Sequence, residues 1–257
     1  MKVVILAGGY GTRISEESQN KPKPMVEIGG FPIIWHIMKI FSAQGYNDFI
    51  ICAGYKQYII KEYFANYFLH CSDVTFDFRN SNKVTIHSEH AEPWRVTVVD
   101  TGLDTMTGGR IKRIKDFIHG EPFFLTYGDG VANVDLDKLL RFHNDSDCIG
   151  TITAVSVAQR FGCVNLDEKY NVTSFREKDA MDGTLVNAGF MVMEPEIFDY
   201  IDDDETVFEK EPLESIAKEG KLNAYIHDGF WKPVDTLREK NQLEDMWRNE
   251  NAPWKIW

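Results

Sequence analysis

The alternation of short apolar runs with amphipathic stretches over the first 160 residues is the feature that most constrains the fold. Residues 3–6, 48–55, 121–130 and 149–157 are typical of buried strands, and the segments between them carry apolar residues at helical spacing. Strands that alternate with helices form βαβ units, whose strands run parallel and whose helices cover the sheet. We therefore expect an α/β fold with three layers, in which helices flank a mixed, mostly parallel sheet.

Two parts of the chain depart from this alternation. Residues 74–100 contain three short β-rich pieces with no helix between them, so a small antiparallel excursion is expected there. After residue 160 the pattern is more mixed, with strands expected near residues 163–167, 172–178 and 185–193 and helices near residues 211–220 and 237–249. No repeat, low-complexity tract or linker interrupts the chain. We expect one Rossmann-like domain over residues 1–257, with a β-rich insertion at about 74–100 and a C-terminal mixed part at about 160–257.

The charge of the chain limits what it binds. The formal net charge is -12, which argues against a general nucleic-acid binder, so an anionic ligand would have to meet a local cationic pocket. No apolar stretch of about 18 residues is present, and no membrane span is expected. The four cysteines form no C-x-x-C pair, and the apolar run at the start is too short for a signal sequence. We therefore expect reduced thiols and a cytoplasmic protein.

Glycine and positive charge gather directly after the first strand, in "LAGGYGTR" and "KPKPM". Gly8, Gly9 and Gly11 allow backbone N–H groups to turn toward an oxyanion, with no Cβ in the way of a phosphate. The dinucleotide fingerprint fails because residue 14 is isoleucine, and no Gly-Lys-Ser/Thr of a P-loop is present. A plain tight turn is the alternative, but Arg13 and Lys23 favour a phosphate site. The prolines after Lys21 and Lys23 hold this segment extended.

Two aspartates are candidate metal ligands. Asp129 in "LTYGDG" lies between two glycines at the end of an expected strand, where parallel sheets bind ligands. Asp235 in "GFWKPVDT" is a candidate second carboxylate. Carboxylate oxygens, together with water and substrate phosphate, suit Mg²⁺. The alternatives are a β-turn role for Asp129 and a helix N-cap role for Asp235.

Two further segments carry candidate ligand groups. In "TGLDTMTGGRIKRIK", Arg110 follows two glycines and could reach a ligand, whereas Lys112, Arg113 and Lys115 are expected on a solvated helix face. In "FREKD" and "VNAGF", the side chains of Glu177 and Asn187 suit sugar hydroxyls and that of Lys178 suits a phosphate. An ordinary surface pair is the alternative for Glu177 and Lys178.

Taken together, these motifs resemble the signature of the sugar-1-phosphate nucleotidylyltransferases. "LAGGYGTR" with "KPKPM" resembles the glycine-rich loop, "GDG" the metal-binding strand end, "REK" the sugar-phosphate strand and "VNAGF" the sugar-hydroxyl strand. Longer stretches, such as "EPWRVTVVDTG", "MTGGR" and "GFWKPVDTLREKNQLE", are similar to the cytidylyl-transferring branch of this family. The resemblance covers nearly the whole chain. One departure is Asp179, where many relatives have proline, and we expect it to alter loop geometry rather than chemistry.

The resemblance implies an enzyme that transfers CMP from CTP to α-D-glucose 1-phosphate, giving CDP-glucose and pyrophosphate for nucleotide-sugar and surface-polysaccharide (O-antigen, lipopolysaccharide) biosynthesis. It implies Mg²⁺ as cofactor, held by Asp129 and Asp235, and catalytic roles for Arg13 and Lys23. The implied nucleotide-binding residues are Leu6, Ala7, Gly8, Gly9, Gly11, Thr12, Arg13, Lys23, Thr105 and Arg110. The implied sugar-phosphate-binding residues are Tyr127, Gly130, Glu177, Lys178, Asn187, Gly189 and Trp231. It also implies a homo-oligomer, namely a hexamer.

Two alternatives stay open at the level of sequence. A uridylyl- or thymidylyltransferase would use the same phosphate and metal groups, because these are indifferent to the base. A nucleotide-sugar sensor without turnover would share the fold, although a sensor has no need of the metal pair. The two are separated by measuring pyrophosphate release with each nucleotide.

Overall fold

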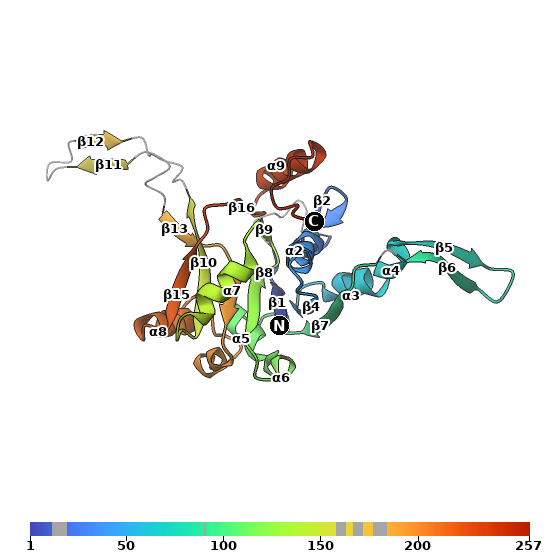
Figure 1. Cartoon of the computed structure of the whole chain (residues 1–257), viewed down its shortest axis with the longest axis horizontal. Coiled ribbons are helices and arrows are strands. Elements are labelled where there is room, and N and C mark those ends of the chain that lie inside the picture. The colour runs from blue at the N-terminus through green and yellow to red at the C-terminus, as the bar shows by residue number, and fades with distance from the viewer. Residues whose placement is uncertain (12–19, 90, 158–162, 167–171, 177–183) are drawn as a thin grey trace.

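The computed structural model describes residues 1–11, 20–89, 91–157, 163–166, 172–176 and 184–257. In this part of the chain, the largest sheet has eight strands in the order β13-β10-β14-β8-β1-β4-β7, with β15 paired to β10 (Figure 1). These strands are β1 (Lys2–Ala7), β4 (Asp48–Ala53), β7 (Arg95–Asp100), β8 (Phe123–Tyr127), β10 (Gly150–Val157), β13 (Thr184–Asn187), β14 (Met191–Met193) and β15 (Leu222–Ile226).

Most neighbouring strands of this sheet run parallel. β1 lies parallel to β4 and β8, β7 lies parallel to β4, and β15 lies parallel to β10. β14 runs antiparallel to β8 and β10, and β13 runs antiparallel to β10. The prediction of a mixed, mostly parallel sheet is therefore confirmed.

Helices cover both faces of the sheet. The α-helices are α2 (Ile33–Ser42), α3 (Gln57–Ala65), α4 (Tyr67–His70), α5 (Thr107–Lys112), α6 (Lys115–Ile118), α7 (Leu136–Asn144), α8 (Glu211–Lys218) and α9 (Leu237–Arg248). The described residues also form two short 3-10 helices, η2 (Lys23–Met25) and η4 (Pro195–Tyr200).

Alternate side chains of β1 pack into two separate hydrophobic cores, one on each face of the sheet, because successive residues of a strand point to opposite faces. Val3 and Ile5 pack into a core that includes buried residues of α2, α3, α7 and α9. Val4 and Leu6 pack into a second core with buried residues of α5, α6 and α8. Both cores are closed to solvent, so the central strands are apolar on both faces, as their sequences predicted. The expected three-layer architecture is confirmed.

In the ranges that the structure describes, four small two-stranded sheets accompany the main one. They are β2 (Glu27–Ile28) with β3 (Phe31–Pro32), β5 (Ser72–Asp77) with β6 (Lys83–Glu89), β9 (Gly130–Ala132) with β16 (Trp231–Pro233), and β11 (Cys163–Leu166) with β12 (Val172–Arg176). The β9–β16 pair joins the end of β8 to the C-terminal part of the chain.

Two expectations about the region after β4 need correction. The antiparallel excursion consists of β5 and β6, whereas the third expected piece, β7, is a parallel edge strand of the main sheet. Its apolar pattern indicates a strand but carries no information about its partner, which lies more than 40 residues upstream. The segment over residues 57–69, whose apolar residues recur at helical spacing, forms two helices and not one. The break occurs because Asn66 leaves the helical conformation and donates from its side chain to the carbonyl of Glu62 at 2.9 Å.

The β5–β6 hairpin projects from the body of the molecule (Figure 1) and has an apolar and a polar face. Phe76 lies on the same face as its cross-strand partner Val84 and as Ile86, which pairs with Val74. Just beyond the end of β5, the ring of Phe78 stacks on that of Phe76 with 6.5 Å between their centroids. Phe76, Phe78, Val84 and Ile86 are all exposed, Phe78 at 77%. The opposite face carries threonines and charged side chains. An antiparallel sheet normally covers its apolar face, so this hairpin presents a surface suited to a partner.

In the described part of the chain, none of the helices combines the length and the apolar character that a membrane span requires. Cys52, Cys71 and Cys148 have free thiols, and burial raises the pKa of Cys52 to about 12.

Candidate active site

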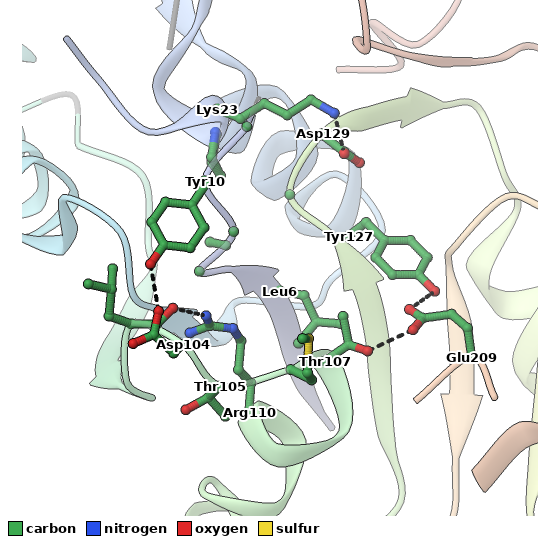
Figure 2. A pocket seen from close by; sticks show the side chains of 18 residues that line it. Leu6, Tyr10, Lys23, Asp104, Thr105, Thr107, Arg110, Tyr127, Asp129 and Glu209 are labelled. Atoms are coloured by element: carbon green, nitrogen blue, oxygen red, sulfur yellow. Dashed lines mark hydrogen bonds and ion pairs between the residues drawn. The ribbon is translucent and has the colours of Figure 1, made fainter. Parts of the chain in front are cut away.

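A cavity of about 620 Å³ opens at the carboxyl ends of β1 and β8, which is the edge where parallel α/β sheets bind ligands (Figure 2). Its floor is formed by the last residues of β1, the glycine-rich turn and the end of β8. Residues 103–107 line one wall, and Glu209 lies across the cavity from Tyr10 and Asp104. The residues that line it are Leu6, Ala7, Gly8, Gly9, Tyr10, Gly11, Lys23, Pro24, Leu103, Asp104, Thr105, Met106, Thr107, Arg110, Tyr127, Gly128, Asp129 and Glu209.

Lys23 is a buried cation at one end of this cavity, with 8% of the residue exposed. It begins η2, directly after the extended Pro22, and Pro24 follows it in the helix. The prolines restrict the backbone on both sides of Lys23, but the expectation that they hold this lysine extended is wrong, because Lys23 forms the first residue of a 3-10 helix. The Nζ atom lies 2.6 Å from Oδ2 of Asp129 and 2.6 Å from Oδ1 of Asp235.

Asp129 and Asp235 reach the same lysine from distant parts of the chain. Asp129 stands in the tight connection between β8 and β9, and its backbone carbonyl accepts from the N–H of Val234 at 2.8 Å. β9 pairs with β16, so the residues after β16 return to the end of β8. The N-cap of α9 is Thr236, which forms a capping box with Glu239. The predicted alternative, that Asp235 caps this helix, is therefore wrong.

These two aspartates are the group best suited to a divalent cation. They are partly exposed, they carry two negative charges against the single charge of Lys23, and hard carboxylate oxygens suit Mg²⁺. Over the described ranges, no three side chains of His, Cys, Asp or Glu come together as a complete metal site. A cation here would complete its shell with ligand oxygens and water, which is the usual way in which Mg²⁺ binds beside phosphates.

Arg110 lies at the opposite end of the cavity and is 5% exposed. Its Nη1 donates to the hydroxyl of Thr101 at 2.9 Å and to the carbonyl of Gly102 at 2.6 Å, and its Nη2 donates to the carbonyl of Leu103 at 3.1 Å. Burial lowers its pKa from the usual arginine value. These three hydrogen bonds hold residues 101–103 in place. Because all three acceptors are uncharged, they do not neutralise the guanidinium, and its positive charge remains in the cavity wall.

The glycine-rich turn makes room for this guanidinium. A Cβ on Gly8 would lie 2.2 Å from Nη1 of Arg110, and a Cβ on Gly54 would lie 2.5 Å from the same atom. By contrast, a Cβ on Gly9 would meet no atom within 4 Å. Gly8 is thus required by contact with Arg110, a reason that the sequence motif alone did not reveal. Gly11 adopts a positive φ of 67°, which favours glycine.

Residues 103–107 close the cavity above the turn. The hydroxyl of Tyr10 donates to Oδ1 of Asp104 at 2.7 Å, which ties this loop to the glycine-rich turn. That hydrogen bond raises the pKa of Tyr10. Thr105 is nearly buried, and it lines the cavity between Asp104 and α5.

A second, smaller cavity of about 40 Å³ adjoins the first and shares Tyr127 and Asp129 with it. Gly130, Asn187 and Trp231 also line it. Asn187 accepts from the N–H of Gly189 at 3.0 Å through its side-chain oxygen, and the indole of Trp231 donates to the carbonyl of Ala188 at 2.8 Å. Gly189 has a φ of 75°, and a Cβ there would crowd Tyr127 at 3.1 Å.

Glu209 is a cavity residue that sequence reasoning missed. It precedes α8 in "DDDETVFEKE", where one carboxylate among six acidic residues carries no signal of its own. Its Oε1 accepts from the hydroxyl of Tyr127 at 2.7 Å, and its Oε2 accepts from that of Thr107 at 2.6 Å. Burial, followed by the charge of Glu209, raises the pKa of Tyr127, so this phenol remains a donor.

The structure thus gathers most of the predicted residues around two adjoining cavities. The large cavity contains every predicted nucleotide-binding residue that is described, together with Tyr127 and Asp129. Gly189 lies beside the smaller cavity without lining it. Thr12, Arg13, Glu177 and Lys178 lie outside the described residues. The expected exposure of the helix face with Lys112, Arg113 and Lys115 is confirmed, although Arg113 also pairs with Asp204.

Comparison with known proteins places this site in a family. The family model described as nucleotidyl transferase matches residues 2–243. The chain is 53% identical over 258 residues to the glucose-1-phosphate cytidylyltransferase of Salmonella typhi, with 100% of both chains covered. It is 43% identical over 258 residues to a probable glucose-1-phosphate cytidylyltransferase of Bacillus subtilis, again with 100% of both covered.

Solved structures agree on the fold. HddC from Yersinia pseudotuberculosis matches with a TM-score of 0.68 and 25% identity, over 96% of this chain and 99% of that one. UDP-glucose pyrophosphorylase from Acinetobacter baumanii matches with a TM-score of 0.71 and 16% identity, over 99% and 95%, which supports the fold alone. The chain therefore belongs to the nucleotidyl transferase family, in its branch of glucose-1-phosphate cytidylyltransferases.

Proposed function

We propose that this protein transfers CMP from CTP to α-D-glucose 1-phosphate, giving CDP-glucose and pyrophosphate. The observation that carries the proposal is the position of Lys23, held by two carboxylates at the side of a cavity whose floor is a glycine-rich turn. Full-length similarity to glucose-1-phosphate cytidylyltransferases supports the choice of both substrates. The whole chain would act as one nucleotidyltransferase domain, since strands from residue 2 to residue 226 share one sheet.

The cytosine and the triphosphate would occupy the large cavity. The backbone of Leu6, Ala7, Gly8 and the loop that contains Thr105 and Arg110 supply donors and acceptors near the base. The N–H groups of Gly9, Gly11 and Thr12, together with the side chain of Arg13, would receive the β- and γ-phosphates. The retained positive charge of Arg110 suits an acceptor on the base or a phosphate oxygen.

Lys23 would contact the α-phosphate. A phosphate oxygen of glucose 1-phosphate attacks the α-phosphorus, a new P–O bond forms, and the bond from the α-phosphorus to the bridging oxygen breaks to release pyrophosphate. The attacking oxygen is already anionic near neutral pH, so no general base is needed. The obstacle is electrostatic repulsion between the sugar phosphate and the triphosphate. The protein would lower this barrier by positioning the two substrates and by placing the positive charges of Lys23 and Arg13 beside their phosphates.

Mg²⁺ is the divalent cation that we propose for Asp129 and Asp235. When bound, it would neutralise charge on phosphate oxygens, as metal ions do in phosphoryl transfer generally. The protein's own part is to hold the two carboxylates side by side through the β9–β16 pairing. Lys23 keeps them together before a ligand arrives.

The sugar phosphate would occupy the smaller cavity and the adjoining part of the large one, where both are lined by Tyr127 and Asp129. Lys178 would bind the phosphate, and Glu177, Asn187 and Gly189 would contact hydroxyls. Tyr127, Gly130 and Trp231 would shape the walls, consistent with their places around this cavity. The side-chain oxygen of Asn187 accepts from the N–H of Gly189, and its amide nitrogen donates to Sδ of Met191 at 3.7 Å. The second hydrogen of this amide would be the donor toward the ligand.

Pyrophosphate release tests the function directly. The protein is incubated with Mg²⁺ and each combination of CTP, UTP, dTTP, GTP or ATP with glucose, galactose or mannose 1-phosphate. We expect the fastest release with CTP and glucose 1-phosphate. Faster turnover with UTP or dTTP would replace the cytidylyl assignment, and release with no pair would favour a sensor.

We also propose a homo-oligomer, namely a hexamer, in the cytoplasm, where CDP-glucose would enter the synthesis of surface polysaccharides such as O-antigen. The exposed apolar face of the β5–β6 hairpin supports self-association. The free thiols of Cys52, Cys71 and Cys148 suit a reducing compartment.

A further inference from the structure

We propose that Glu209 selects ribonucleotides by accepting a hydrogen bond from a ribose hydroxyl of the nucleotide. This inference rests on the proposed function and adds a residue that no motif in the sequence marks. Glu209 lies in the segment between η4 and α8 and lines the large cavity. Figure 2 shows it on the wall across from Tyr10 and Asp104.

Two hydroxyls fix the carboxylate of Glu209 in one orientation. Tyr127 at the end of β8 donates to one oxygen, and Thr107 at the start of α5 donates to the other, at 2.7 and 2.6 Å. The hydroxyl of Thr107 in turn accepts from the N–H of Phe208 at 2.9 Å, which directs its proton toward Glu209. The carboxylate is therefore held in place before a ligand binds.

The chemistry of a carboxylate defines what it can contact. An ionised carboxylate only accepts hydrogen bonds, and its two oxygens have about four acceptor directions. Two of these are used by Tyr127 and Thr107, so capacity remains for a ligand donor. A phosphate would be repelled, whereas a hydroxyl would be bound. In a cavity that receives a nucleoside triphosphate, Glu209 would therefore contact the ribose or the base and not a phosphate group.

The layout of the cavity assigns that part to the ribose. The base is placed beside Gly8 and Arg110, and the α-phosphate beside Lys23, so the ribose that joins them crosses the floor between these points. That floor is made by the ends of β1 and β8, where the N–H of Gly128 donates to the carbonyl of Leu6 at 2.9 Å. Tyr127 precedes Gly128, and Glu209 is hydrogen-bonded to Tyr127, which puts the carboxylate beside this path.

Kinetics with deoxynucleotides test the proposal. Wild-type protein, Glu209→Ala and Glu209→Gln are assayed with CTP, 2′-deoxy-CTP and 3′-deoxy-CTP at saturating glucose 1-phosphate. We expect the wild type to prefer CTP over at least one analogue. Glu209→Ala should lower kcat/KM for CTP by about 10-fold or more, the scale of losing a charge-assisted hydrogen bond, and leave that analogue unchanged. Glu209→Gln keeps the shape and an acceptor, so it should show a smaller loss.

Two further variants separate this role from a structural one. Glu211→Ala removes an exposed carboxylate two residues away, in the first turn of α8 and outside the cavity, and should keep the preference of the wild type. Thr107→Val keeps Glu209 but removes one of its two anchors, and should weaken the same preference partially. Urea denaturation of each variant identifies any that fails to fold, and Glu209→Gln then provides the comparison.

Four results would overturn the proposal. They are equal kcat/KM of the wild type for CTP and both analogues, an unchanged ribose preference in Glu209→Ala, a change confined to the KM for glucose 1-phosphate, and a change confined to the choice between CTP and UTP. The last two would place Glu209 at the sugar or at the base. Failure of the proposed function would look different, because the wild type would then release no pyrophosphate from CTP.

Discussion

Lys23 and Asp235 are separated by 212 positions in the sequence, yet Nζ of Lys23 lies 2.6 Å from Oδ1 of Asp235. The same Nζ lies 2.6 Å from Asp129, so one cation joins the first strand's loop to two carboxylates contributed by later elements. Any ligand that approaches Lys23 therefore also approaches the proposed metal ligands. The electrostatics of the site depend on these three side chains as a unit.

The first prediction concerns Lys23 itself. Lys23→Ala should lower kcat by at least about 100-fold, because a preorganised charge at the reacting phosphate is removed. The control is Lys21→Ala, since Lys21 lies two residues earlier and pairs on the surface with Glu27 at 2.8 Å. We expect the control to stay within about two-fold of wild type in steady-state pyrophosphate release. Near-normal turnover of Lys23→Ala would remove Lys23 from the mechanism.

The second prediction concerns the metal. Asp129→Asn and Asp235→Asn should each raise the Mg²⁺ concentration that gives half-maximal rate by about 10-fold or more, because each loses one anionic ligand. The rate is measured over a Mg²⁺ titration after treatment with a chelator. Asp116→Asn, on the exposed side of α6, serves as the matched control and should titrate like the wild type. An unchanged Mg²⁺ dependence in both site variants would place the metal elsewhere.

The ends of strands and the glycine turns could be predicted from the sequence, because each depends on a short run of neighbouring residues. Val3 to Leu6 is apolar without interruption and Asp129 lies between two glycines, so each pattern predicted its own place at the carboxyl edge of a parallel sheet. The strand with which each strand pairs could not be predicted in this way. The strand character of β7 was evident, but its pairing with β4 depends on tertiary packing, and the expected antiparallel pairing was wrong.

The site shows the same division. Arg110 was expected to reach a ligand, and it does line the cavity, but three of its donor contacts hold residues 101–103. Which acceptors surround a guanidinium is decided by the fold of the loop and not by the glycines before it. Glu209 had no local pattern at all, and only the approach of α5, β8 and the segment before α8 gives it a role.

The third prediction tests the contact between Gly8 and Arg110. In Gly8→Ala the new Cβ would lie 2.2 Å from Nη1, and the guanidinium cannot withdraw without breaking its buried hydrogen bonds. We expect the free energy of unfolding in urea to fall by about 1–3 kcal/mol, the usual cost of overpacking. Gly9→Ala places a Cβ where no atom lies within 4 Å, and its stability should stay within about 1 kcal/mol of wild type. Equal stability of the two variants would contradict this reading of Gly8.

The fourth prediction concerns assembly. Phe78→Asp and Phe76→Asp place a charge on the apolar face of the β5–β6 hairpin, and each should reduce the mass of the particle measured by light scattering after gel filtration. Thr85→Asp puts the same charge on the opposite face of the same hairpin and should leave the mass unchanged. A wild-type monomer, or an oligomer that tolerates both phenylalanine substitutions, would exclude this face as the interface.

The fifth prediction concerns His36, a residue of α2 that is fully buried among aromatic rings. Its Nε2 donates to the carbonyl of Ile28 at 2.8 Å, while its Nδ1 accepts from the indole of Trp254 at 3.3 Å, which requires a neutral ring. Burial lowers its pKa to about 4 from 6.5. The unfolded chain therefore binds a proton at a higher pH than the folded protein does. The stability due to this histidine is complete above pH 6.5 and is lost as the pH falls from 6.5 toward 4.

The pH dependence of unfolding in urea measures this loss. Between pH 7 and pH 4.5, the wild type should lose about 2 kcal/mol more than His36→Gln, which cannot take up the proton. Carboxylates also titrate near the lower end of this range, but they are common to both proteins and cancel in the difference. His87→Gln, which replaces an exposed histidine on the β5–β6 hairpin, should follow the wild type. Parallel curves for the wild type and His36→Gln would mean that the buried ring accepts its proton without opening the core.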